Sequence, residues 1–259
     1  MTAIIDAGAD ELLRLAAAVR DGAADPPAPD ETLRVGVDLG TATCVLVVLA
    51  TGRDGRQRPL WVAGHPSGAL RDGVVVDFAA ATAAVRRLKD AAAEALGVAL
   101  DRAATAYPPC IPVGDARACR YVCESAGFAD VVLVDEVSAA QRTLGVRDGV
   151  VVDVGGGSTG VGVFRDGALV ALDDRAGGGH HLDLMLAGAL GLPLEAAEPY
   201  KREHPREAFP VLVPGLQRIA ENVRALTVGA EELPLHVAGG ALMLPGAATY
   251  WPPTWSEPS

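Results

Sequence analysis

The chain has 259 residues, half of them hydrophobic, and a formal net charge of −11. This length predicts one large domain or two lobes with a substantial core, and the acidic excess disfavours nucleic acid and anionic membranes as partners. No apolar run is long enough for a membrane span, and the acidic N-terminus lacks the basic residues of a secretory signal. We therefore expect a cytoplasmic protein.

The first part of the chain predicts an α/β lobe. Residues 1–32 predict a short helix, Asp10–Arg20, and a stiff proline-rich linker, Asp25–Glu31. Strands are predicted at residues 33–39, 43–50, 60–63, 103–107 and 131–134, and helices at 78–96, 115–125 and 138–144. The order β-β-β-α-β-α-β-α defines a first lobe over residues 33–146.

The pattern then restarts. Strands are predicted at residues 149–154, 159–164, 168–172 and 235–238, and helices at 181–190, 194–202 and 214–226. VGVDLGTATCVLVV (35–48) and VVDVGGGSTGVGVF (151–164) each contain a strand, an aspartate, a Gly-Ser/Thr turn and a second strand. This internal repeat predicts a second lobe of the same plan over 147–246, shortened at its C-terminus and followed by a tail, 247–259.

The loop after Asp153 contains a literal G-x-G-x-x-G, but its context excludes a dinucleotide turn. Such a turn leads into a helix that holds the pyrophosphate, whereas VGVFRDGALVAL after Gly160 has strand patterning. No P-loop motif occurs. The glycines still allow backbone N–H groups to approach an anion, and an aspartate at each strand end could hold a hydrated Mg²⁺. The two loops therefore favour a two-sided phosphate clamp over purely structural turns.

These motifs resemble those of the actin, hexokinase and DnaK-type chaperone superfamily. VGVDLGTATC is similar to its first phosphate loop, VVDVGGGSTG to the second, VLVDEVSAA (132–140) to the connecting helix, AEPYKRE (197–203) to the nucleotide-side helix and VAGGALMLPG (237–246) to the adenosine motif. The resemblance implies a two-lobed, actin-like (ribonuclease H-like) ATPase fold. Within the superfamily, RDGVVVDF, YPPCIP, ESAGF and AGGGHHLDLMLAGALG most resemble the ethanolamine-utilisation protein J family.

The resemblance assigns roles to individual residues. Asp38 and Asp153 would hold the waters of Mg²⁺, and Glu136 would orient the water that attacks ATP, because phosphoryl transfer depends on alignment and charge neutralisation. The nucleotide-binding positions that it implies are Gly40, Thr41, Thr43, Gly155, Gly156, Gly157, Ser158, Glu198, Lys201, Gly239 and Gly240. The implied cofactors are ATP or ADP and Mg²⁺.

Each assignment has a structural alternative. The two aspartates could cap turns, Glu136 could be an acid at a helix start, and Glu198 and Lys201 could form a surface pair. His180 and His181 point about 100° apart on a helix, which disfavours one shared metal. The cysteines (44, 110, 119 and 123) lack zinc or redox spacing, so we expect buried reduced thiols.

Three functions are compatible with this pattern. The first is an ATP-binding, slowly hydrolysing accessory protein of ethanolamine utilization, whose lobe closure acts on a client such as ethanolamine ammonia-lyase or a bacterial microcompartment component. The second is an actin- or MreB-like protein that assembles with nucleotide, and the third is a scaffold without ATP. Departures such as Gly160, where DnaK-type proteins carry an acid, favour nucleotide binding over rapid hydrolysis.

Overall fold

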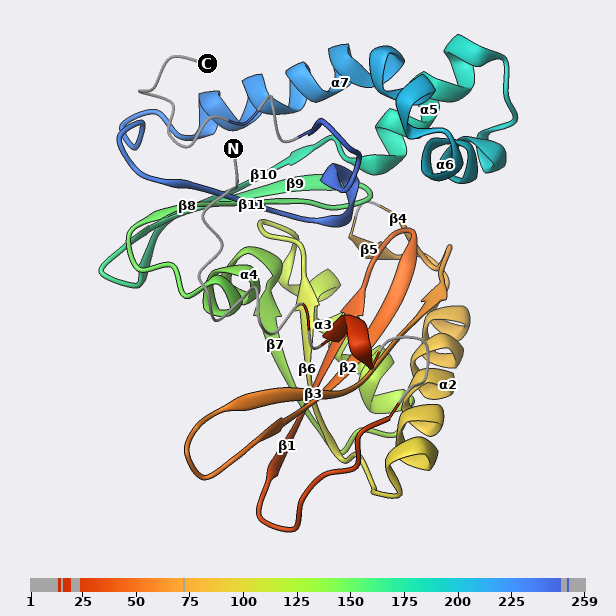
Figure 1. Cartoon of the computed structure of the whole chain (residues 1–259), viewed down its shortest axis with the longest axis vertical. Helices are drawn as coiled ribbons and strands as arrows, with labels where there is room; N and C mark the ends of the chain where they lie inside the picture. The colour runs from red at the N-terminus through yellow and green to blue at the C-terminus, as the bar shows by residue number, and fades with distance from the viewer. Residues whose placement is uncertain (1–13, 15, 20–23, 72, 248–250, 252–259) are drawn as a thin grey trace. The chain divides into compact units, whose positions relative to one another are not determined.

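The computed structural model describes residues 14, 16–19, 24–71, 73–247 and 251. The chain divides into two compact units between Asp135 and Glu136 (Figure 1). We call the part before this division the first unit and the part after it the second unit, and each is described by itself.

The first unit contains a sheet with the strand order β3-β2-β1-β6-β7. Its strands are β1 (Thr32–Leu39), β2 (Thr43–Thr51), β3 (Gln57–Pro66), β6 (Arg102–Tyr107) and β7 (Asp130–Asp135). The first three are antiparallel neighbours, and β6 and β7 continue the sheet parallel to β1. A short hairpin of β4 (Leu70–Arg71) and β5 (Val74–Val75), which the sequence pattern did not predict, forms a separate sheet.

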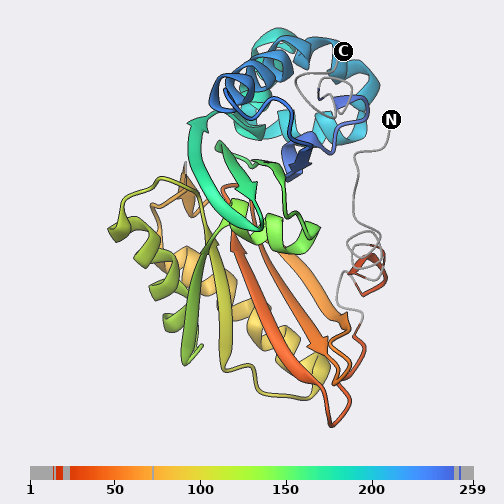
Figure 2. The same ribbon diagram turned by 90° about the vertical axis from the view of Figure 1, so that its left-hand side faces the viewer.

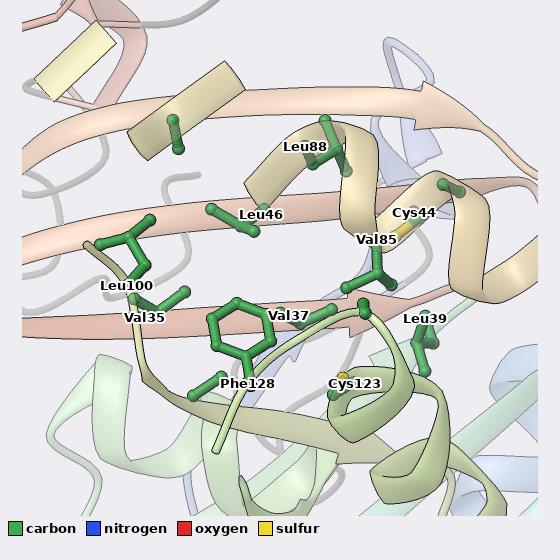
Figure 3. Packing of buried hydrophobic residues seen from close by; sticks show 14 of the residues in the cluster. Val35, Val37, Leu39, Cys44, Leu46, Val85, Leu88, Leu100, Cys123 and Phe128 are labelled. Atoms are coloured by element: carbon green, nitrogen blue, oxygen red, sulfur yellow. The ribbon is translucent and has the colours of Figure 1, made fainter. Parts of the chain in front are cut away.

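Helices α2 (Phe78–Leu96) and α3 (Val113–Ser125) complete the first unit. Helix α2 has the predicted bounds because both of its ends are encoded locally: the Asp77 carboxylate accepts from the Ala80 N–H at 2.9 Å, and Gly97 ends the helix with φ +68°. Its Val85 and Leu88 pack over the buried face of β1 and β2 (Figure 3).

The cysteines divide between core and surface. Cys44, Cys119 and Cys123 are buried in the first unit, as expected. Cys110 is exposed, so the expectation of burial is wrong for this residue. It follows two prolines in a loop with φ +62°, where no regular element draws it into the core.

The proline-rich segment is fixed to the first unit through β3. Arg58 forms an ion pair with Asp25 and a two-pronged contact with Glu31, at 2.8 and 2.7 Å. The hydrogen bond from Arg58 lowers the pKa of Glu31 to about 2. The segment is therefore an attached strap rather than a free spacer. Most of the predicted helix Asp10–Arg20 lies outside the described residues, although Arg14 and residues 16–18 are helical.

The second unit contains a sheet with the order β10-β9-β8-β11. Its strands are β8 (Gly149–Val154), β9 (Ser158–Arg165), β10 (Ala168–Ala176) and β11 (Leu235–Ala238). Its helices are α4 (Glu136–Leu144), α5 (Gly179–Leu190), α6 (Leu194–Glu203) and α7 (Pro205–Leu226), with a 3₁₀ turn, η1, at Gly240–Leu242. Both sheets thus start with three antiparallel strands and add a parallel strand beside the first. Among the described residues, the second sheet contains four strands.

Both faces of the second sheet are covered (Figure 2). Val150, Val152 and Val154 of β8 pack in the core that contains side chains of α5, α6 and α7, whereas Val151 packs in a smaller cluster with Val137 of α4. Burial of every residue of β8 except the half-buried Asp153 follows from this two-sided covering. Among the described residues, no helix is both long and apolar enough to cross a membrane.

The predicted start of α7 at Pro214 is wrong. The helix begins at Pro205, and both Pro210 and Pro214 lie inside it. The predicted helix started at Pro214, and the first position is where proline is common in helices. Here the apolar face, with Leu212, Leu216 and other side chains in the core, maintains the helix on both sides of the prolines.

Candidate functional site: two aspartate–glycine loops

In the first unit, the β1–β2 loop carries four predicted site residues. β1 ends at Leu39 and β2 starts at Thr43, so Gly40, Thr41 and Ala42 form the connection. A Cβ on Gly40 would lie 2.7 Å from the carbonyl oxygen of Thr43, so the turn requires glycine. Asp38 is exposed between two buried residues of β1, on the face away from the α2–α3 core. Its charge adds to burial in raising the pKa of the Cys44 thiol to about 12.

In the second unit, the β8–β9 loop runs from Gly155 to Gly157 and into Ser158 at the start of β9. Its carbonyl oxygens are held by the segment that starts α5. Gly179 N–H donates to Gly155 O at 2.9 Å, His180 N–H to Gly156 O at 2.8 Å, and Gly177 N–H to Gly157 O at 3.1 Å. A Cβ on Gly178 would lie 2.4 Å from Gly155 O. The glycine triplet 177–179 thus supports the loop, a role that the resemblance had suggested for this stretch.

Unlike the carbonyl groups of this loop, which all accept hydrogen bonds, two of its amide groups have no backbone partner among the described residues. The Gly155 N–H donates to Ser158 O at 3.0 Å, which closes the turn. The N–H groups of Gly156 and Gly157 have no backbone acceptor among the described residues. Successive backbone N–H groups of a turn that have no other acceptor can bind an anion. The loop is therefore chemically suited to a phosphate.

Asp153 lies at the end of β8, directly before this loop. The residue is half-buried, and removal of its carboxylate from water raises its pKa. Its side chain has no hydrogen-bond or ion-pair partner in the described part of the chain, and burial alone accounts for the raised pKa. An oxygen ligand of this kind fits Mg²⁺, which is bound through one or two carboxylates while it keeps several waters.

Glu136 is the first residue of α4, and the packing of this helix determines where it lies. Val137 is fully buried, and a Cβ on Gly162 of β9 would lie 2.5 Å from its Cγ1 atom. Gly162 thus allows the first turn of α4 to approach the sheet closely. Glu136 is half-buried at this point, on the same face of the sheet as Val151 and hence as Asp153, two residues along β8.

The structure buries the Lys201 side chain in the second unit, whereas the Glu198 side chain is 36% exposed. Lys201 is 8% exposed and lies between two carboxylates, 2.6 Å from Asp183 of α5 and 2.5 Å from Glu198. The i,i+3 pair of Glu198 and Lys201 is therefore present, but its lysine is buried rather than at the surface. Burial opposes ionisation of Glu198, but hydrogen bonds from Lys201 and Arg202 lower its pKa overall. Asp183, which the sequence assignment missed, makes this contact a link between α5 and α6.

The two glycines of the VAGG motif have different surroundings. Gly239 has φ +100°, and a Cβ there would lie 2.3 Å from the carbonyl oxygen of Val154. This glycine is thus required by contact with the strand that leads into the phosphate loop. Gly240 is exposed, and a Cβ there would meet nothing within 4 Å. Only Gly240 has free space beside it for a ligand.

His180 and His181 are exposed at the start of α5, with ring centroids 6.3 Å apart. In the described ranges, no three His, Cys, Asp or Glu side chains are grouped to hold a metal ion. The backbone of His180, not its ring, contributes to the site by supporting Gly156.

Two sheets of repeated plan, each with an aspartate and a glycine turn after its first strand, define an actin-like fold. Residues 65–188 match the family model of MreB/Mbl protein. A crystal structure of MreB5 from Spiroplasma citri bound to AMPPNP has a TM-score of 0.66 at 16% identity and covers 87% of this chain and 89% of its own. The predicted two-lobed, actin-like fold class is thereby confirmed.

The family of this chain is shown by relatives that are more similar in sequence than MreB5. The ethanolamine utilization protein EutJ of Salmonella typhimurium is 39% identical over 221 residues, which cover 85% of this chain and 77% of that protein. EutJ of Escherichia coli is 38% identical over 223 residues. The crystal structure of EutJ from Carboxydothermus hydrogenoformans matches with a TM-score of 0.85 and 39% identity, over 93% of this chain and 88% of that one. The chain belongs to the EutJ family of ethanolamine utilization proteins, as the sequence motifs predicted.

Proposed function

We propose that this protein binds ATP and ADP with Mg²⁺ and hydrolyses ATP slowly. The observation that carries the proposal is the β8–β9 loop, in which the Gly156 and Gly157 N–H groups lack backbone acceptors beside the Asp153 carboxylate. Structures of MreB5, which shares the fold, contain AMPPNP and ADP, and this supports a nucleotide as the ligand.

Different residues would bind the phosphates and the cation. The Gly156 and Gly157 amides would donate to phosphate oxygens, and Asp153 would accept from waters of the cation. A bound Mg²⁺ would neutralise phosphate charge and so favour phosphoryl transfer to water. We propose that Asp38, Gly40, Thr41 and Thr43 contribute to phosphate binding in the same way, and that Gly240 contacts the nucleoside.

Calorimetry tests the binding. We expect wild-type protein to bind ATP and ADP in the presence of Mg²⁺, and Asp153→Ala and Asp38→Ala each to weaken ATP binding at least about tenfold, or about 1.4 kcal/mol. Asp173→Asn is the matched control, because Asp173 pairs with Val161 and so faces the opposite side of the sheet from Asp153. Absence of heat from either nucleotide with wild-type protein would refute the proposal and leave a scaffold without ATP.

Hydrolysis is tested at Glu136. We propose that its carboxylate orients the attacking water, so Glu136→Gln should lower turnover at least about tenfold, within the range of acid–base contributions. The affinity for ATP should stay within about threefold, because the substitution removes no phosphate contact. Phosphate release and calorimetry on the same preparation measure the two quantities. Unchanged turnover would remove this assignment.

The purpose of the ATP cycle is proposed from the family. Membership in the EutJ family favours a client within ethanolamine utilization, such as ethanolamine ammonia-lyase or a microcompartment component, on which a chaperone-like or reactivating cycle would act. Co-purification with purified candidate clients, in ATP and in ADP, tests this; a client whose retention is equal in both states would not be regulated by the cycle.

A second candidate function is nucleotide-dependent assembly. The match of residues 65–188 to the MreB/Mbl model favours it. Light scattering during addition of Mg²⁺ and ATP at high protein concentration tests this function. A flat signal from protein that binds ATP would exclude assembly under these conditions and leave the accessory role.

A further inference from the structure

A row of three residues crosses the second sheet beside the glycine loop. Gly160 of β9 pairs with Asp153 of β8 on one side and with Asp174 of β10 on the other. Paired residues of neighbouring strands project to the same face, and two strand spacings separate the aspartate Cα atoms by about 10 Å. Since Gly160 has no side chain, the space between the two carboxylates is not filled from the middle strand.

The position of this row follows from the packing of α4. The preceding row on the same face consists of Val151, Gly162 and Leu172, which lie in or beside the cluster that contains Val137. The following residues on β8 and β9 belong to the glycine loop. The two aspartates therefore lie between an apolar contact and the free amides of Gly156 and Gly157.

Among the described residues, neither carboxylate forms an ion pair with a lysine or arginine, although the Arg175 charge acts on Asp174 from a distance. Asp153 has no side-chain partner among the described residues, and the Oδ1 atom of Asp174 is buried without a hydrogen bond. Burial raises the pKa of Asp174 to about 6 and the charges of Asp173 and Asp153 add to the rise, whereas the Ser158 hydroxyl and the Arg175 charge partly offset it. Arg175, the nearest arginine in sequence, pairs with Asp173 at 3.3 Å. Buried charges of one sign require a counter-charge.

We propose that Asp153 and Asp174 together hold one hydrated divalent cation across Gly160. A carboxylate that binds through a metal-bound water lies about 4–5 Å from the metal. One hydrated ion can therefore span two oxygens that lie about 8–10 Å apart, the range available to carboxylates on next-nearest strands. Three direct protein ligands are not required, in agreement with the absence of such a group from the described residues.

Asp174 also affects the binding of phosphate at the loop. This part of the inference rests on the proposed function. Asp174 contacts Ser158, a residue of the loop, so a phosphate at this loop approaches two carboxylates. Without a cation, like charges oppose that approach. Asp174 thereby makes phosphate binding at the loop dependent on the divalent ion. The alternative is that Asp174 only orients the Ser158 hydroxyl, a role that asparagine can also perform.

Manganese binding to the full-length, nucleotide-free protein tests the site. Electron paramagnetic resonance of free Mn²⁺ should show one site per chain in the wild type. Asp174→Asn and Asp153→Asn should each weaken this site at least about tenfold, while Asp173→Asn, which removes the same charge from the opposite face, should change it less than about twofold. Equal affinity of the wild type and Asp174→Asn, or no bound Mn²⁺ in the wild type, would overturn the proposal.

A nucleotide titration separates the two proposals. In EDTA, we expect Asp174→Asn to bind ATP at least about tenfold more tightly than the wild type, because repulsion is relieved. If Mn²⁺ binding depends on Asp174 but ATP never binds, the cation site stands and the proposed function fails. If ATP binds but Mn²⁺ affinity is indifferent to Asp174, the proposed function stands and this inference fails.

Discussion

Replacement of Lys201 by methionine is expected to destabilise the second unit by about 3–5 kcal/mol, because it leaves the carboxylates of Asp183 and Glu198 without their shared cation. Methionine preserves most of the length and apolar volume of the side chain, so the loss reports the charge. Urea unfolding gives the free energy, and hydrogen exchange of α5 and α6 peptides assigns the loss to the second unit.

The matched control is Arg202→Met. Arg202 also contacts Glu198, at 2.7 Å, but its side chain is 73% exposed, and an exposed pair contributes about 0–1 kcal/mol. The double variant Lys201→Met with Asp183→Leu should recover part of the loss, since it removes the principal unpaired charge. Nucleotide is absent from these measurements. A Lys201→Met protein as stable as Arg202→Met would show that Lys201 is not required to link the helices.

Replacement of Gly239 by alanine is expected to cost about 2–6 kcal/mol in the absence of nucleotide. A non-glycine residue in this backbone region costs about 1–3 kcal/mol, and the added Cβ would lie 2.3 Å from the Val154 carbonyl oxygen. Relief of that contact must move β11 or the end of β8, which adds a packing cost of about 1–3 kcal/mol. Thermal and urea unfolding of the nucleotide-free protein measure the change.

Gly240→Ala is the control for the adjacent position, where a Cβ has open space. We expect its unfolding free energy to stay within about 0.5 kcal/mol of the wild type. If Gly240 contacts the nucleoside, as proposed, the same variant should weaken ATP binding measured by calorimetry. Equal stability of the two alanine variants would refute the structural requirement at Gly239.

The sequence predictions were accurate where the determining interactions are between residues that are close along the chain, and inaccurate where they are not. Helix α2 was bounded correctly because its cap residues, Asp77 and Gly97, adjoin it in the sequence. Helix α7 was started too late because its first turns are maintained by core packing in spite of Pro210 and Pro214. The attachment of Asp25 and Glu31 to the first unit was not predicted, because their partner Arg58 lies on β3, far along the chain.

In the candidate site, too, the features set by neighbours along the chain were predicted and those set by long-range pairing were not. The aspartate–glycine repeats at Asp38 and Asp153 were legible in the sequence because a strand, a turn and a strand adjoin one another along the chain. The contribution of Asp174 could not be read in this way, because it depends on the register of β10 against β9. A search for acids on the strand following the glycine loop could have found it as a candidate.

The sequence by itself therefore determined the repeated plan, the family and the location of the two glycine loops, because these depend on residues that are neighbours along the chain. Only the tertiary structure decided that Lys201 is enclosed by two carboxylates, that Gly239 is required by Val154, and that Asp174 faces Gly160. Each of these three contacts joins residues of separate elements. They depend on burial and strand register, which arise only when the chain folds.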